Sequence, residues 1–403
     1  MKSIIVLNDF PMYPPDHGGK LRIYNIYREL SSEYKIIYIC FGNNKTILEN
    51  KITEKFIEIR IPKGNVHRCL EWFLGKLLGI AVDDIVAMLL CRSNRNLDRT
   101  IGKYLADCEL VVLSLPYMFP AVKDLSGDKI LVYESQNVEY SLKKSILREG
   151  FIRDRLCNHV KDIEGGLAEA CDILFVTSEL DRDGVKEIYG TDNKKMYISP
   201  NGTDLSAFKS LYRDGKLCKD KILPIPLAIF IGSGHPPNVE AAKIILTDIA
   251  PKAQDIYFLI CGSVCWMIRD MPKGKNVGLG YMISDEEKLG LYRAADIALN
   301  PMLSGSGTNI KMLDYMAAGL PIITTPVGAR GLDIKDYTHA IICEISEFPR
   351  AIFEVIKDKD LYIKLSVNGH ELVKEKYDWK NIAKEMAKIY EAIGMGSSFN
   401  KTT

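Results

Sequence analysis

The sequence predicts an α/β protein with two doubly wound, Rossmann-like domains. Short apolar runs recur along the chain, and each ends in small or turn-forming residues before a helical pattern begins. Their hydrophobicity is continuous rather than alternating, which is typical of parallel strands covered by helices on both faces. The series begins again in the second half of the chain, so we expect two sheets.

The predicted strands fall into two sets. The first set is Ile4–Leu7, Ile36–Phe41, Leu110–Leu115, Ile130–Tyr133, Ile173–Thr177 and Met196–Ile198. The second set is Leu227–Ile231, Ile256–Cys261, Val277–Leu279, Ile297–Leu299, Ile322–Thr324 and Ala340–Cys343.

The expected domains are residues 1–205 and 227–378, joined by a linker at 206–226. The linker is polar and closes with Pro224 and Pro226. A chain of 403 residues, 47% hydrophobic and 26% charged, is long enough for two such cores. Because open α/β sheets bind ligands at the carboxyl ends of their strands, we expect the function in a cleft between the two domains.

The charge and the cysteines exclude several classes of protein. Lys and Arg number 53 against 52 Asp and Glu, so neither nucleic acid nor an anionic membrane is expected as the main partner. Ten cysteines occur without the dense spacing of a disulfide scaffold, which favours a reducing cytosol. The apolar run within residues 1–9 is too short for a signal peptide or a membrane span. We therefore expect a cytoplasmic protein.

The most informative segment is the loop and helix that begin at Ser304. Small residues lead directly into a helical pattern, so backbone N–H groups and the positive end of the helix dipole would face a ligand. One turn into the helix, Lys311 can add a cation, and Asp314 can accept hydrogen bonds from sugar hydroxyls. The loop residues that would contact the diphosphate of a nucleotide sugar are Gly305, Ser306, Gly307, Thr308, Asn309 and Ile310.

A second glycine-containing loop follows the first strand of the second domain. Gly232 would let a ligand approach the backbone, while Ser233 and Asn238 could hydrogen-bond it. An ordinary turn between a strand and a helix explains the same residues.

The first domain has a similar loop after its first strand. Gly18 and Gly19 could close against the diphosphate, with His17, Lys20 or Arg22 supplying charge. A loop histidine is also often a solvent-exposed bystander, so His17 is only a candidate.

A polar segment at another strand end of the first domain suits a hydroxylated acceptor. Glu134, Asn137 and Glu139 place carboxylates and an amide where such strands face a cleft, although a helix cap explains them too. The turn at Pro200–Asp204 has two explanations, a hinge before the linker or a contact with the ligand.

Two patterns that could bind metal have simpler explanations. Asp181 and Asp183 fall on a solvated helix face, and Cys261 and Cys265 have no nearby histidine. No metal and no cofactor are expected.

The apolar segment Arg68–Val82 has two explanations. It could lie on the surface of the inner membrane, at its cytoplasmic face, or it could be helices that pack on the first sheet. Glu71, Asp83 and Asp84 oppose an anionic surface.

With these motifs the chain resembles the GT-B glycosyltransferases, and among them the retaining family four, over nearly its full length. The residues that carry the resemblance are Gly18–Gly19, Ser199–Asp204, Phe230–Gly234, Gly278–Tyr281 and, most specifically, Leu313–Pro321. Tyr377–Lys380 and the amphipathic pattern after it look like the family's final helix. The resemblance implies two Rossmann-like domains that face each other across a cleft, and a helix at 379–395 that packs back on the first domain.

The resemblance also implies roles for residues of the donor domain. Asp314 takes the place of the second acid of a paired motif and would hold the nucleotide ribose, whereas Ser306 stands where the first acid is usual. Gly280 and Tyr281 look like the segment that receives the nucleobase.

The family's usual Arg and Lys after the first strand of this domain are here Ser233 and, approximately, Asn238. Lys311 or Arg330 would then supply the phosphate contact instead.

The activity that the resemblance implies is transfer of a sugar, with retention and without metal, from a UDP- or GDP-sugar to a glycan or a lipid-linked acceptor. The setting would be polysaccharide or cell-envelope glycan biosynthesis, and the candidate catalytic residues are Lys311, Ser306 and His17. Two alternatives stay open: a non-catalytic sugar-nucleotide-binding subunit that supports a partner enzyme, and a UDP-sugar epimerase on the same fold.

Overall fold

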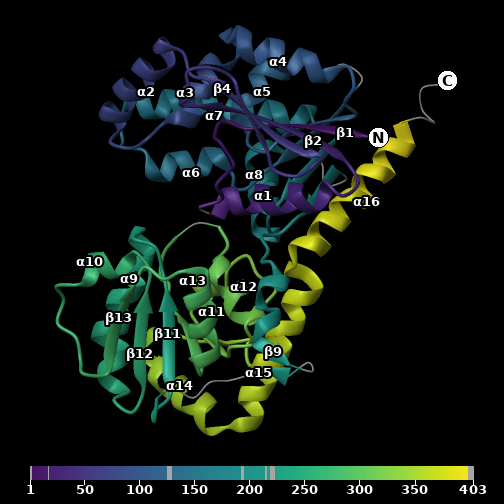
Figure 1. The fold of residues 1–403 in the computed structure, drawn as a ribbon. Coiled ribbons are helices and arrows are strands. Elements are labelled where there is room, and N and C mark those ends of the chain that lie inside the picture. The colour runs from purple at the N-terminus through teal and green to yellow at the C-terminus, as the bar shows by residue number, and fades with distance from the viewer. Residues whose placement is uncertain are drawn as a thin grey trace. The chain divides into compact units, whose positions relative to one another are not determined.

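The computed structural model divides the chain into two compact units, which are described separately (Figure 1). Unit 1 comprises Met1–Pro200 and Ile382–Thr403, and unit 2 comprises Asn201–Asn381. The residues described are 2–16, 18–124, 129–191, 195–213, 216–217, 223–305 and 307–397.

Unit 1 is built on an eight-stranded sheet with the order β3-β4-β2-β1-β5-β6-β7-β8. Neighbouring strands are parallel except β3 and β4, which are antiparallel. The strands are β1 (Ser3–Leu7), β2 (Lys35–Gly42), β3 (Leu48–Lys51), β4 (Phe56–Pro62), β5 (Leu110–Leu113), β6 (Ile130–Glu134), β7 (Ile173–Val176) and β8 (Met196–Ile198).

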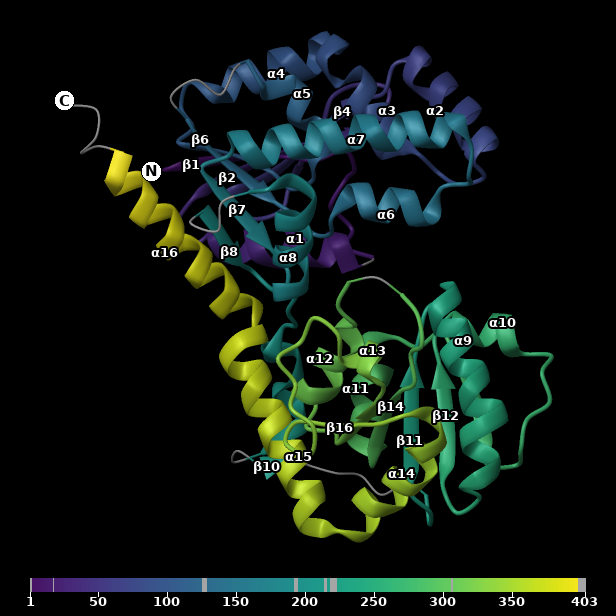
Figure 2. The same cartoon turned by 180° about the vertical axis from the view of Figure 1, so that it is seen from behind.

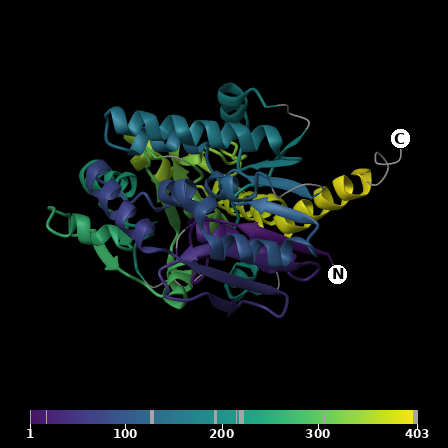
Figure 3. The same ribbon diagram turned by 90° about the horizontal axis from the view of Figure 1, so that it is seen from above.

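The predicted strands of unit 1 are confirmed, and their residues form its core because both faces of the sheet are covered by helices. The helices are α1 (Gly18–Leu30), α2 (Asn65–Leu78), α3 (Asp83–Leu90), α4 (Arg95–Leu105), α5 (Phe119–Val122), α6 (Glu139–Ile146), α7 (Phe151–Ala170) and α8 (Glu179–Tyr189). The longest of these, α7, is the extended teal helix in the view from above (Figure 3).

Unit 2 has a six-stranded, fully parallel sheet with the order β13-β12-β11-β14-β15-β16. All six predicted strands of this half are present: β11 (Leu227–Ile231), β12 (Tyr257–Cys261), β13 (Val277–Tyr281), β14 (Ile297–Asn300), β15 (Ile322–Thr324) and β16 (Ile341–Ile342). Its helices are α9 (Pro236–Ile244), α10 (Val264–Ile268), α11 (Asp285–Ala294), α12 (Ile310–Ala317), α13 (Pro326–Ala329), α14 (Phe348–Lys357) and α15 (Lys359–Leu372).

The segment between the two predicted domains begins with a 3-10 helix, Leu205–Leu211, followed by the short antiparallel strands β9 (Tyr212–Arg213) and β10 (Lys216–Leu217). Phe208 of the 3-10 helix stacks on Tyr292, with 5.9 Å between the ring centroids, so this segment packs within unit 2.

The last helix, α16 (Trp379–Ser397), starts in unit 2, and from Ile382 onward it belongs to unit 1. Within unit 1 the ring of Tyr390 lies 6.4 Å from that of Tyr34 and 5.9 Å from that of Phe175. Among the described residues no helix has both the length and the apolar character to cross a bilayer.

Local sequence signals set where the helices begin and end. The hydroxyl of Ser178 accepts a hydrogen bond from the backbone of Asp181 and so caps α8, which ends at Gly190 in the left-handed conformation with φ 66°. Ser284 and Glu287 form a reciprocal capping box at the start of α11. The Asp181 carboxylate also accepts from the hydroxyl of Ser178, at 2.6 Å, so its role here is in the helix start.

Candidate donor site

The carboxyl ends of three neighbouring strands of unit 2 bring the predicted loops together. Strand β14 lies between β11 and β15 in the sheet, so the loops that follow these strands meet at one edge. The backbone N–H of Ile231 donates to the hydroxyl of Tyr315, at 2.8 Å, and this bond ties the end of β11 to helix α12.

The loop before α12 exposes backbone donors. Gly305 and Gly307 have φ values of 123° and 70°, which favour glycine over any other residue. Within the described residues no hydrogen bond uses the backbone N–H of Thr308, Asn309 or Ile310, and all three residues are half-buried. These are the unsatisfied donors that every helix start presents, so this one can bind an anion.

Two side chains hold this loop in place. Arg330 Nη2 donates to the carbonyl of Gly305 at 2.5 Å and to that of Gly307 at 3.4 Å. The side-chain amide of Asn309 donates to the carbonyl of Gly328 at 3.1 Å. Because these bonds use carbonyl oxygens, they leave the N–H groups of the loop available.

Lys311 is the cation beside these donors. Its Nζ donates to Oδ1 of Asn238 at 2.5 Å and lies 4.3 Å from the ring centre of Phe230. The Asn238 amide in turn donates to the hydroxyl of Ser233 at 3.0 Å. Burial lowers the pKa of Lys311 to about 7, and no carboxylate opposes the shift. An anion placed here would favour the charged amine.

The two glycines after β11 have structural tasks. The N–H of Gly232 donates to the carbonyl of Cys261 at 2.9 Å, and the N–H of Gly234 donates to the hydroxyl of Ser263 at 2.9 Å. A Cβ atom at Gly232 would lie 2.9 Å from Cε1 of Phe230 and 3.2 Å from Cβ of Asn238. The turn therefore requires glycine for close packing, which is the simpler of the two explanations considered for Gly232, while Ser233 stays connected to Lys311.

Asp314 is already partly engaged. One carboxylate oxygen accepts from the hydroxyl of Thr203 at 2.8 Å, and the other accepts from Nζ of Lys288 at 2.6 Å. The hydroxyl of Tyr292 also hydrogen-bonds this carboxylate, which has about four acceptor positions, so about one remains for a ribose hydroxyl. The contact of Lys288 with Asp314 was not predicted, because the two residues lie in different helices.

Gly280 and Tyr281 end strand β13. Tyr281 has φ 49°, and its ring lies 4.6 Å from that of Trp266, at an interplanar angle of 51°. A Cβ atom at Gly280 would lie 2.6 Å from the sulfur of Cys261, so this position needs glycine. Trp266 was not expected at the site, although half of its side chain is exposed beside Tyr281.

In unit 1, Gly18 and Gly19 form the first turn of α1, as the loop pattern predicts. Arg22, which the sequence offered for the ligand, is only 1% exposed. Its two terminal nitrogens donate to the carbonyl of Pro200 at 2.7 Å and to the hydroxyl of Ser199 at 2.9 Å. These contacts connect α1 to the Ser199–Pro200 segment and so stabilise unit 1.

The carboxylates after β6 are also buried. Glu134 accepts from the hydroxyl of Tyr27 at 2.7 Å, and burial raises its pKa although Arg22 opposes the shift. Glu139 accepts from the hydroxyl of Tyr117 at 2.6 Å. Burial, followed by repulsion from Glu164, raises the pKa of Glu139 to about 7.

Asn137 is the accessible member of this group, because it is half-buried rather than buried. Its carbonyl accepts from the hydroxyl of Ser135 at 2.7 Å, and its side-chain amide makes no hydrogen bond with the described residues.

His17 and Ser306 lie outside the described residues. In the part of the chain that the structure describes, no three His, Cys, Asp or Glu side chains gather as a metal site.

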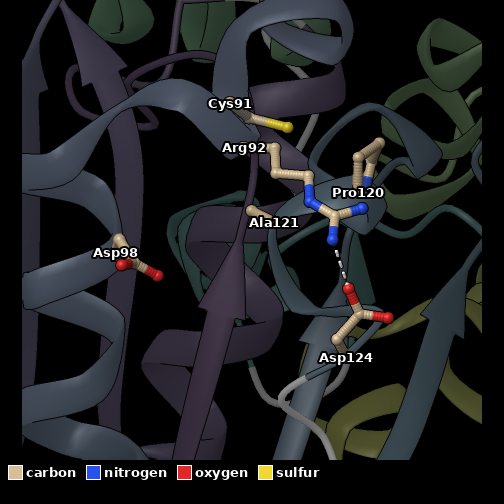
Figure 4. A pocket seen from close by; sticks show the side chains of 6 residues that line it. All are labelled: Cys91, Arg92, Asp98, Pro120, Ala121 and Asp124. Carbon is tan, nitrogen blue, oxygen red and sulfur yellow. Dashed lines mark hydrogen bonds and ion pairs between the residues drawn. The ribbon is translucent and has the colours of Figure 1, made fainter.

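A surface hollow of about 260 Å³ in unit 1 is lined by other residues: Cys91, Arg92, Asp98, Pro120, Ala121 and Asp124 (Figure 4). The ion pair of Arg92 and Asp124, 2.6 Å long, crosses it, and none of the predicted site residues lines it.

Solved structures with the same fold define the class of this protein. Sucrose-phosphate synthase from Thermosynechococcus elongatus is similar with a TM-score of 0.68 at 15% identity, over 98% of this chain and all of its own. HepE from Anabaena, solved with UDP-glucose, is similar with a TM-score of 0.66 at 13% identity, over 97% of this chain and all of its own. The fold is GT-B, as predicted.

The family match lies in unit 2, where residues 225–358 match the model described as glycosyl transferases group 1. A protein of Klebsiella pneumoniae, described as an uncharacterized 44.6 kDa protein in the cps region, is 23% identical over 94% of this chain and 97% of its own. A phosphatidyl-myo-inositol mannosyltransferase of Mycobacterium tuberculosis is 25% identical over 54% of this chain, which spans 59% of that enzyme. The family match and the fold together support a glycosyltransferase of the GT-B type, and the predicted resemblance to that class is confirmed, whereas the assignment to the retaining family four stays a prediction.

Proposed function

We propose that this glycosyltransferase uses a nucleoside-diphosphate sugar, a UDP- or GDP-sugar, as its donor and binds the diphosphate in unit 2. The observation that carries the proposal is the pairing of Lys311, which has an amide partner but no carboxylate partner, with accessible N–H groups at Thr308 to Ile310. Both kinds of donor suit a doubly charged phosphate. Asp314 lies four residues into the same helix and keeps an acceptor position for a ribose hydroxyl.

In the proposed reaction the bond between the anomeric carbon and the diphosphate oxygen breaks, and a bond from the acceptor oxygen to that carbon forms. The acceptor proton goes to the departing diphosphate, and the anomeric configuration is retained. Lys311 and the loop amides stabilise the negative charge that develops on the leaving group, which is the task of preorganised donors in such sites. A bound metal is not required for this task.

The acceptor is proposed to be a glycan or a lipid-linked sugar of polysaccharide or cell-envelope synthesis. Two relatives support this class of acceptor: the Klebsiella protein is named for a cps region, and the mycobacterial enzyme is named for a phosphatidylinositol. In unit 1, Asn137 is the accessible member of the polar segment predicted for the acceptor.

The test is a calorimetric titration in which UDP or GDP is added to the full chain and to Lys311→Ala. Lys243→Ala is the matched control, because Lys243 is an exposed lysine on the neighbouring helix α9. We expect one nucleotide to bind, Lys311→Ala to weaken it, and the control to leave it unchanged. Equal binding by all three proteins would remove Lys311 from the site.

A turnover assay separates the enzyme from a non-catalytic binding subunit. Release of free nucleoside diphosphate from the matching nucleotide sugar, stimulated by a membrane or glycan extract, is the expected result. Tight binding without any release would favour the subunit, and interconversion of two UDP-sugars without an acceptor would favour the epimerase.

A further inference from the structure

Helix α2 in unit 1 carries an outward row of apolar side chains. Val66, Trp72 and Phe73 are 71%, 63% and 57% exposed, Leu77 continues the row, and Ile80 extends it just beyond the end of α2. Val66, Phe73 and Leu77 are spaced by seven and four residues, which places them on one face of the helix. Single exposed apolar residues are normal, but a contiguous row of large ones indicates an interaction surface.

The turn between α6 and α7 extends this surface. Ile146, Phe151 and Ile152 are exposed there, and Leu147 between them packs into the buried cluster that contains Leu74 of α2. The two views of Figures 1 and 2 agree that α2 and this turn lie at the same side of unit 1. We call this surface the apolar edge: Val66, Trp72, Phe73, Leu77, Ile80, Ile146, Phe151 and Ile152.

The charges around the apolar edge are mostly positive. Residues 65–80 and 144–155 contain six basic residues and three acidic ones, whereas the whole chain is nearly neutral at +1. Five of the basic side chains are exposed: Arg68, Lys76, Lys144, Arg148 and Arg155. Glu149 and Asp154 are exposed as well, and both pair with Arg153. Lys76 lies with its Nζ 4.2 Å from the ring centre of Trp72, so a cation and an aromatic ring share one place on the surface.

The acidic residues that opposed an anionic partner in the sequence are largely turned away from this surface. The Glu71 side chain is 16% exposed and binds Nζ of Lys63 at 2.5 Å. Asp84 is 23% exposed and pairs with Lys143. Asp83 remains about half exposed and lies 3.4 Å from Nζ of Lys63. The fold therefore separates these carboxylates from the row of apolar side chains on α2.

We propose that the apolar edge docks this protein on a lipid bilayer that contains anionic headgroups. Large apolar side chains would enter the boundary between headgroups and acyl chains, while the basic side chains around them would contact lipid phosphates. Trp72 and its neighbour Lys76 have the amphipathic character that suits this depth. A second copy of the chain would bring the same excess of positive charge to the contact, and the two surfaces would repel each other. A bilayer with anionic headgroups opposes this charge, so it is the better partner.

The test is sedimentation of the full chain with vesicles of phosphatidylcholine alone or of phosphatidylcholine and phosphatidylglycerol in equal parts. The protein should sediment with the mixed vesicles and not with the neutral ones, and added salt should release it. Trp72→Ser combined with Phe73→Ser should reduce the bound fraction by about tenfold, since two of the largest inserting side chains are lost. Arg68→Gln combined with Lys76→Gln should weaken binding and its dependence on salt.

Matched controls are Ile363→Ser with Val367→Ser and Lys359→Gln with Lys364→Gln, exposed pairs on α15 of unit 2, which should bind vesicles as the parent does. Circular dichroism verifies that each variant is folded. Failure to sediment with mixed vesicles, or sedimentation that the edge variants do not change, would overturn the proposal. So would a dimer in sedimentation velocity that Trp72→Ser and Phe73→Ser dissociate without any vesicle binding. Donor binding takes no part in this assay, so its outcome leaves the donor site untouched.

Discussion

The polar side chains at the carboxyl ends of the two sheets differ in how many hydrogen-bond and charge partners the protein itself provides for them. In unit 1, Glu134 and Glu139 are buried, and each accepts a hydrogen bond from a tyrosine hydroxyl. In unit 2, the neutral amide of Asn238 is the one hydrogen-bond partner of Lys311 among the described residues, and the amine lies beside accessible backbone donors. A buried polar group that is fully paired stabilises the fold, whereas an under-paired charge in an accessible place marks a ligand site. We therefore expect the carboxyl end of the first sheet to stabilise the fold and that of the second sheet to bind the ligand.

The largest effect that sharpens this comparison is expected at Arg22. Arg22→Leu would leave the Pro200 carbonyl and the Ser199 hydroxyl without their donor and would remove the cation that opposes the pKa rise of Glu134. We expect a loss of about 3 kcal/mol in the free energy of unfolding of unit 1, because buried charges lose their partner. Urea denaturation measures it, and unchanged stability would show that Arg22 has no fastening role.

The second effect is a loss of affinity for the donor that leaves the stability of the protein unchanged. Lys311→Ala should weaken binding of the nucleoside diphosphate by about thirtyfold, the equivalent of about 2 kcal/mol for a charge-assisted contact. The unfolding midpoint of the free protein should not fall, because the amine is poorly solvated in the empty site. A variant that loses stability as well as affinity would place Lys311 among the structural residues, with Glu134.

The third effect is the dependence of that affinity on pH. The pKa of Lys311 is about 7 in the free protein, and a bound diphosphate raises it, so the charged amine is the form that binds. Affinity should be highest below the free pKa, fall as the pH rises above about 7, and level off above the pKa of the complex. Titrations at increasing pH check this slope, which should be absent in Lys311→Met.

The smallest effect is expected at Asn238. Asn238→Ala removes the acceptor of Lys311 and the donor of Ser233, so the amine loses its orientation but keeps its charge. Affinity should fall about threefold to fivefold, which corresponds to one neutral hydrogen bond of about 1 kcal/mol. A loss as large as that of Lys311→Ala would show that Asn238 itself contacts the ligand.

The sequence predicted the sheets because their central strands are continuously apolar, and the runs at Ile36–Phe41 and Leu227–Phe230 are indeed buried. It did not predict β3 and β4, which lie at the edge of the first sheet. β3 is mostly exposed, and Glu58 interrupts the apolar run of β4, so neither has the continuous pattern.

The loop before α12 could be predicted because its glycines and the following helix are contiguous in the chain. The burial of Arg22 could not, since its partners lie 177 and 178 residues away. The same holds for Lys288 beside Asp314, which depends on how α11 packs against α12. Contacts between distant elements decide whether a polar residue stabilises the fold or stays available, and a local pattern does not contain them.

If Lys311 and the loop amides neutralise the diphosphate, the protein should take up protons as the nucleotide binds. Calorimetric titration with the nucleotide near pH 8, in two buffers of different ionisation enthalpy, measures the number of protons bound. We expect an uptake that approaches one proton per nucleotide and disappears in Lys311→Met, because the pKa of Lys311 is about 7 in the free protein and rises beside the diphosphate. Binding with no proton uptake, or with an uptake that survives in Lys311→Met, would contradict it.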